Sequence, residues 1–198
     1  MQIEMRKRIA NLTSNILNPF LVSLVIILLL SFESTPSIVD ALKWSLILVV
    51  ISILPVFSVT TYLIRNQRLD DLFIGVRKQR TKIYLLASVC ALFGCIILLY
   101  LGAPLMLVAT FVAGLSAIVI FMCINLLWKI SLHTALIAAS VTVLLILYGS
   151  IAAITAVLLP LIAWARIELE HHSLAQVTTG ALLAALIVVV VFYLFGLV

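Results

Sequence analysis

The side chains best suited to chemistry stand in two short polar islands of an otherwise apolar chain. One island contains Arg166, His171 and His172, and the other contains Ser131 and His133. Guanidinium groups suit the binding of phosphate oxygens. Two histidines can divide a phosphoryl transfer, one acting as nucleophile and the other as proton donor to the leaving oxygen. Because ionisable side chains are costly near hydrocarbon, we treat these residues as functional candidates.

A third island, residues 65–82, carries most of the remaining charge. Arg77 and Arg80 are three residues apart, so on a helical turn they would project to the same side. We expect Arg77, Lys78 and Arg80 to add cations to the phosphate site. The alternative for this group is an ordinary cytoplasmic loop that contacts anionic lipid head groups.

Three residues that begin at the end of the island containing Arg166 are spaced by four, which places them on one face of a helix. They are His172, Gln176 and Gly180. We expect Gln176 to orient the imidazole of His172. We expect Gly180, which has no side chain, to let a neighbouring segment approach closely.

The composition predicts an integral membrane protein. The chain has 198 residues, of which 66% are hydrophobic and 10% charged, whereas a soluble domain is about 25% charged. The predicted fold class is all-α, a polytopic bundle of six to seven transmembrane helices. We expect a basic lead-in over residues 1–14, a single transmembrane domain over residues 15–198 and no cleavable signal sequence.

The apolar runs predict the positions of these spans. They lie at about residues 15–30, 42–62, 83–101, 105–127, 128–148, 151–164 and 174–198. With seven spans, every Lys and Arg except Lys43 lies on one side of the membrane. The positive-inside rule then places the three islands on the cytoplasmic face of the cell membrane. Since the net charge of +5 is distributed among loops, it indicates topology and no nucleic-acid partner.

Two islands resemble motifs of the type 2 phosphatidic acid phosphatase family, which are integral membrane lipid phosphatases. The family's second motif reads Pro-Ser-Gly-His, and the chain matches it at Ser131 and His133. The third motif reads Ser-Arg, five residues, His, three residues, Asp. The chain matches its Arg and His at Arg166 and His172, with Gln176 in place of the Asp.

The family's first motif, Lys followed after six residues by Arg-Pro, is matched loosely. Arg80 takes the position of the arginine, but Thr81 follows it and Phe73 stands at the lysine position. We expect Arg77 or Lys78 to supply the missing cation. In all, the resemblance covers about residues 77–180, more than half of the chain, and is closest to a divergent microbial branch.

The resemblance implies a role for each matched residue. His172 would be the nucleophile that becomes phosphorylated, and His133 the general acid for the departing group. Ser131 and Arg166 would hold phosphate oxygens, and no cofactor would be needed. A neutral Gln176 can orient the ring but cannot supply the charge of the family's Asp, so slower turnover is expected.

Simpler interpretations of the same residues stay open. His171 and His172 could be an interfacial pair, Ser131 could be a helix cap, and Lys129 next to Trp128 could anchor the chain at the membrane interface. His171 by itself is expected to be interfacial or to support the site indirectly.

The acidic residues do not form a recognisable metal motif. Asp70 and Asp71 invite comparison with the aspartate motifs of membrane prenyltransferases, but the sequence has no second acidic cluster to share the metal. Glu168 and Glu170 flank the histidines without a Cys or further His to complete a ligand set. We therefore expect no metal.

Three functions remain in competition. The first is a metal-independent phosphatase that acts on a lipid phosphate or an isoprenyl (di)phosphate. The second is a membrane protein that binds lipid phosphates without hydrolysing them, and the third is a cyclase-like enzyme that ionises a prenyl diphosphate.

Overall fold

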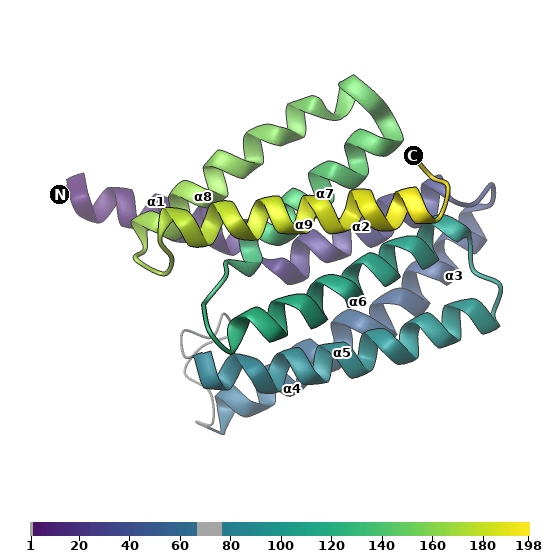
Figure 1. The fold of residues 1–198 in the computed structure, drawn as a ribbon, viewed down its shortest axis with the longest axis horizontal. Coiled ribbons are helices and arrows are strands. Elements are labelled where there is room, and N and C mark those ends of the chain that lie inside the picture. Colours follow the sequence, from purple (N-terminus) through teal and green to yellow (C-terminus); the bar gives the residue numbers. More distant parts are fainter. Residues whose placement is uncertain (1, 67–76) are drawn as a thin grey trace. The chain divides into compact units, whose positions relative to one another are not determined.

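The computed structural model describes residues 2–66 and 77–198, and within these ranges the chain is helical with no strand (Figure 1). The all-α prediction is therefore confirmed. The α-helices are α1 (Gln2–Ile16), α2 (Pro19–Glu33), α3 (Ile38–Leu48), α4 (Leu54–Arg65), α5 (Arg77–Tyr100), α6 (Leu105–Asn125), α7 (Leu132–Tyr148), α8 (Leu158–Glu168) and α9 (Leu174–Leu194). A π-helical segment, η1 (Val49–Ile53), joins α3 to α4, and a 3-10 helix, η2 (Gly149–Val157), joins α7 to α8.

The chain divides into two compact units. The first combines Met1–Val22 with Lys129–Val198, and the second is Ser23–Trp128. The predicted division into a lead-in and one transmembrane domain over residues 15–198 stays a prediction.

Within the described residues, five helical runs are long and apolar enough to cross a membrane. They are Ile38–Arg65, Arg80–Tyr100, Leu105–Asn125, Leu132–Glu168 and Leu174–Leu194. The bent pair of α1 and α2 raises the number to six if the pair counts as one span. The protein is thus membrane-embedded in character, but the predicted number of six to seven spans is not confirmed.

The 37-residue run Leu132–Glu168 reverses direction at Gly149. This glycine has φ of 60°, a left-handed conformation that costs a glycine little because it has no Cβ. After the turn, Ile162 of α8 packs against Ile137 and Val141 of α7 in one buried cluster. Residues 25 positions apart on a straight helix could not meet, so α7 and α8 form a hairpin.

In the second unit, a π-helical segment interrupts the α-helix between α3 and α4. η1 ends two residues before Pro55, whose ring removes a backbone donor and distorts a helix. Residues 102–104, between two of the predicted spans, connect α5 to α6, which pack together. At the far ends of these two helices, Asn125 Nδ2 donates to Thr81 Oγ1 at 3.2 Å.

Candidate active site

Three helix ends of the first unit meet where α7 begins, α8 ends and α9 begins (Figure 1). The segment before α7 lies along the loop between α8 and α9. The backbone N–H of Ser131 donates to the carbonyl of Gln176 at 3.4 Å, and Lys129 Nζ donates to the carbonyl of His171 at 3.3 Å. The two polar islands of the sequence, which are more than 30 residues apart, are therefore neighbours within this unit.

Gly180 allows this close approach. A Cβ at Gly180 would lie 2.7 Å from Ile130 Cγ2 and 3.0 Å from the carbonyl oxygen of Ser131. Both distances are shorter than ordinary van der Waals contact, and the carbonyl belongs to backbone that cannot rotate away. The prediction that Gly180 lets a neighbouring segment approach is confirmed.

The turn after α8 explains the spacing between Arg166 and His172. Glu170 adopts a left-handed φ of 57°, and its N–H donates to the carbonyl of Ile167 at 2.8 Å. The N–H groups of His171 and His172 both donate to the carbonyl of Arg166, at 3.2 and 3.3 Å. These bonds form the helix-ending Schellman motif, which returns the second histidine to the arginine six residues before it.

Arg166 is anchored by a residue that the sequence analysis missed. Its side chain is buried, and Nη1 donates to Ser14 Oγ at 2.9 Å. Ser14 is itself buried on α1, on the same helix face as Ala10, which is fully buried four residues before it. The only signal in the sequence was this i, i+4 pair of small residues within a polar lead-in.

The imidazole of His172 is oriented by Gln176. Nδ1 of His172 lies 3.0 Å from Oε1 of Gln176, and the same oxygen accepts the backbone N–H of Ser173 at 3.3 Å. A backbone N–H can only donate, so the atom facing it is the amide oxygen, and His172 must carry its proton on Nδ1. In the neutral ring, Nε2 then holds the lone pair that a nucleophile requires.

This arrangement depends on the start of α9. Ser173 is the N-cap, and with Gln176 it forms a complete capping box, in which each side chain bonds the other residue's backbone N–H. His172 directly precedes the cap. The local sequence that begins α9 therefore also holds the amide oxygen in the position that fixes the histidine.

His133 and Ser131 belong to the first turn of α7. His133 is 4% exposed and Ser131 is completely buried. Ser131 is the N-cap of α7, and its Oγ accepts the N–H of Thr134 at 3.5 Å. The helix-cap interpretation of Ser131 is thus confirmed, and its predicted contact with phosphate stays a prediction.

The helix ends favour an anion at this junction. α7 and α9 both begin here, and the N-terminus of a helix carries a partial positive charge with N–H groups that can bind an anion. α8 ends here with the opposite sign, which Arg166 in its last turn offsets. The junction therefore combines two helix N-termini with one buried guanidinium.

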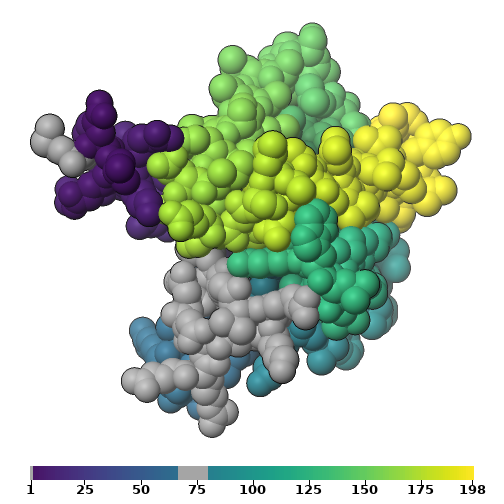
Figure 2. Space-filling model, turned by 60° about the vertical axis from the view of Figure 1, so that its left-hand side comes forward, coloured from purple at the N-terminus to yellow at the C-terminus, as the bar shows by residue number. Residues whose placement is uncertain are grey.

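The acidic residues of the island are paired with α1. Arg6 Nη2 lies 2.7 Å from Glu168 Oε2, and Lys7 Nζ lies 3.2 Å from Glu170 Oε1. In Figure 2 the purple atoms of α1 border the yellow-green atoms at the end of α8. Within the part of the chain that the structure describes, no three His, Cys, Asp or Glu side chains are grouped to hold a metal. The two ion pairs link α1 to the end of α8 and the loop that follows it, and the pair of Lys7 with Glu170 is exposed.

The predicted cations of the third island belong to the second unit. Arg80 is buried there, with Nη2 donating to the hydroxyl of Tyr84 at 2.9 Å. Arg77 and Lys78 begin α5, but their side chains lie outside the described residues. The same holds for Phe73, Asp70 and Asp71. It stays a prediction that these cations bind the same anion as Arg166 and the histidines.

The structure thus brings four of the predicted site residues together: Ser131, Arg166, His172 and Gln176. His133 is buried two residues after Ser131, in the first turn of α7, and its meeting with the ring of His172 stays a prediction. The set contains an oriented imidazole and a buried guanidinium, and with His133 it would hold the groups that phosphoryl transfer through a histidine requires. Comparison with protein-family models, with curated proteins and with solved structures found no match to this chain.

Proposed function

We propose that the protein is an integral membrane phosphatase that hydrolyses a lipid phosphate or an isoprenyl (di)phosphate through a phosphohistidine. The observation that carries this proposal is the hydrogen bond from His172 Nδ1 to Gln176 Oε1, beside the buried Arg166. Burying a guanidinium and two imidazoles near one helix junction is costly in a membrane protein, so these groups indicate a binding or catalytic site. The resemblance to the type 2 phosphatidic acid phosphatases supports the same assignment.

In the first step, Nε2 of His172 attacks the phosphorus atom. The new N–P bond forms as the P–O bond to the lipid alcohol or lipid monophosphate breaks. His133, in its imidazolium form, gives a proton to the departing oxygen. Arg166 and the N-termini of α7 and α9 stabilise the charge that develops on the phosphoryl oxygens.

In the second step, water attacks the phosphorus of the phosphohistidine. His133, now neutral, takes a proton from this water as the O–P bond forms and the N–P bond to His172 breaks. Inorganic phosphate leaves, and His172 returns to the neutral ring with its proton on Nδ1. His133 thus gives one proton to the departing group and regains one from water, so the protein is unchanged after one turnover.

Gln176 favours a second candidate function, the binding of a lipid phosphate without turnover. The cationic ring of a phosphohistidine is stabilised more by a carboxylate than by an amide. If this loss stops the reaction, the oriented imidazole and Arg166 still form an anion site. The third possibility, a cyclase-like enzyme, has no observation in its favour among the described residues.

The proposed site faces the cytoplasm. The reversal at Gly149 lets the run Leu132–Glu168 count as two crossings, and with the bent pair of α1 and α2 this makes seven. Seven crossings place α1, the start of α7 and the loop between α8 and α9 on the side that carries every Lys and Arg except Lys43.

A phosphate-release assay tests the function. Purified protein in detergent is given phosphatidate, farnesyl phosphate and farnesyl diphosphate, each with EDTA present. We expect wild type to release phosphate from at least one of them, and His172→Ala and His133→Ala to lose more than about 99% of this activity.

Each other result has a distinct meaning. Activity that persists in both alanine variants overturns the histidine mechanism. Loss of activity on adding EDTA indicates a metal-dependent enzyme. No release by wild type, together with retained binding of the lipid phosphate, favours the binding protein, and a cyclised organic product favours the cyclase-like enzyme.

A further inference from the structure

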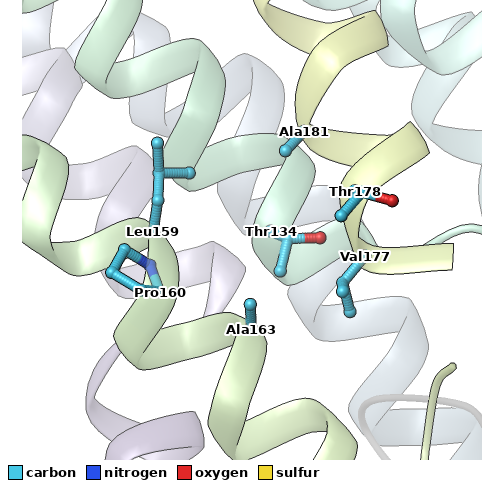
Figure 3. Close-up of a pocket in the computed structure, with 7 residues that line it drawn as sticks. All are labelled: Thr134, Leu159, Pro160, Ala163, Val177, Thr178 and Ala181. Carbon is cyan, nitrogen blue, oxygen red and sulfur yellow. The ribbon is translucent and has the colours of Figure 1, made fainter. Parts of the chain in front are cut away.

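An apolar pocket lies directly behind the polar junction in the first unit. It has a volume of about 180 Å³ and is lined by Thr134, Leu159, Pro160, Ala163, Val177, Thr178 and Ala181. Figure 3 shows the three α8 residues facing the three α9 residues, with Thr134 of α7 between them. Pro160 and Thr178 are exposed, so the pocket opens on the apolar flank of the helices.

The pocket is continuous with the candidate active site along all three helices. Thr134 directly follows His133, Val177 directly follows Gln176, and Ala163 stands three residues before Arg166. At 1.5 Å of rise per residue, these lining residues begin within about one helical turn of the polar groups. A molecule whose phosphate is bound at the junction would therefore have its next atoms in the pocket.

The volume suits one hydrocarbon segment. An apolar cavity of about 150 Å³ in another protein binds benzene, which has six carbons. A pocket of about 180 Å³ consequently accepts the five carbons of an isoprene unit or a similar length of a single chain. Two chains joined by a glycerol unit would not fit in this volume.

Both hydroxyl groups in the wall of the pocket already donate to backbone carbonyls. The hydroxyl of Thr134 donates to the carbonyl of Ser131 at 3.1 Å, and the hydroxyl of Thr178 donates to the carbonyl of Leu174 at 2.9 Å. Pro160 has no N–H. A buried carbonyl without a donor is unfavourable, so ester groups close to the phosphate are disfavoured here, whereas a hydrocarbon chain leaves nothing unsatisfied.

We propose that this pocket binds the first isoprene unit of a prenyl phosphate, so that the substrate is a single-chain isoprenyl (di)phosphate and not a diacylglycerol phosphate. This inference rests on the proposed function only for the turnover of that ligand. Since the lipid bilayer is as apolar as the pocket, the prenyl chain gains little free energy by moving from the bilayer into the pocket. The pocket instead selects by shape and places the first carbon at the phosphate site.

The direct test is photo-crosslinking in a variant that needs no turnover. His172→Ala in detergent is mixed with a farnesyl phosphate that carries a diazirine on its first isoprene unit, then irradiated and digested. We expect the label on Thr134 or within residues 159–181, and we expect unlabelled farnesyl phosphate to displace it at least tenfold better than phosphatidate. A label elsewhere, or equal displacement by phosphatidate, overturns the proposal.

A second test fills the pocket. Ala163→Leu and Ala181→Leu each add volume to its wall, and Ala153→Leu makes the same change at an exposed position of η2 that does not line it. We expect the first two variants to be crosslinked roughly tenfold less than the protein without these substitutions. This agrees with the 10–200-fold effect of one methylene in a fitted pocket. Ala153→Leu should leave it unchanged, and an equal loss in all three contradicts the pocket.

The two proposals fail separately. Crosslinking at the pocket by a protein that releases no phosphate removes the phosphatase but keeps the prenyl site. Phosphate release that depends on His172, together with a label outside Thr134 and residues 159–181, keeps the phosphatase and removes the prenyl site.

Discussion

Arg166 of α8 donates from Nη1 to Ser14 Oγ of α1 at 2.9 Å, across 152 residues of sequence. Both residues are buried, at 3% and 2% exposure. The amino-terminal helix is therefore part of the structure that fixes the candidate phosphate-binding guanidinium. The helix α1 lies outside residues 77–180, to which the motif comparison with lipid phosphatases is limited.

Replacing Ser14 tests whether α1 positions Arg166. Ser14→Ala removes the acceptor of a charged donor, which should lower the free energy of unfolding by about 1–3 kcal/mol and kcat by roughly 10–100-fold, as for other residues that orient a functional group. Ser14→Thr keeps the hydroxyl and should retain most activity. The measurements are thermal unfolding and phosphate release; Ser14→Ala activity equal to wild type would show that Arg166 is held by other means.

Gly180→Ala tests the contact between the starts of α7 and α9. The new Cβ would press on Ile130 and on the backbone carbonyl of Ser131, and such overpacking should cost about 1–3 kcal/mol of unfolding free energy. Gly114 of α6 is the matched control, because a Cβ there has nothing within 4 Å. Gly114→Ala should be neutral or stabilising by up to about 1 kcal/mol. Equal melting temperatures for the two variants would contradict the close approach.

Changes at Gln176 separate orientation from charge. Gln176→Glu can keep the capping box and the bond to His172 while adding the charge that stabilises a cationic ring, so kcat should rise about five- to tenfold. Gln176→Leu removes both bonds and should lower kcat roughly 10–100-fold. Steady-state phosphate release measures both variants. A Gln176→Leu enzyme as fast as wild type would mean that the amide does not orient His172.

The left-handed residue after α8 gives a prediction about stability. An L-residue in this conformation costs about 1–2 kcal/mol, whereas glycine accepts it freely. Glu170→Gly should therefore be neutral or stabilising by up to about 1 kcal/mol, despite the loss of the exposed pair with Lys7, which contributes little. Glu170→Val, with a β-branched side chain, should destabilise by about 1–3 kcal/mol. Chemical denaturation of both variants decides, and a Val variant as stable as the Gly variant would contradict the turn geometry.

Part of the site was predictable because it depends on local spacing. His172 and Gln176 are four apart on a helix that begins with Ser173, and this spacing alone predicts their contact. Gly180 follows on the same face. The sequence predicted that a neighbouring segment approaches it closely, but not that this segment contains Ser131. The helical class and the positions of the apolar runs follow from composition and run length.

The remainder depends on contacts between distant parts of the chain. Nothing near Ser14 indicates that it would meet Arg166, because that contact needs α1 to pack along α8. The left-handed turn at Glu170 was not predicted, since the residue usually found there is glycine. The structure has five or six candidate spans where the apolar runs predicted six to seven, because the run Leu132–Glu168 contains two of the predicted spans and because the pair of α1 and α2 is bent.

The covalent intermediate is the most direct test of the proposed chemistry. Protein is mixed for milliseconds with farnesyl phosphate labelled with ³²P, quenched in base to preserve phosphohistidine, and digested for peptide mass spectrometry. We expect the label on His172 in wild type, more of it in His133→Ala if slow attack by water becomes limiting, and none in His172→Ala. Label on another residue, or turnover of the substrate with no label on His172, would contradict the phosphohistidine mechanism.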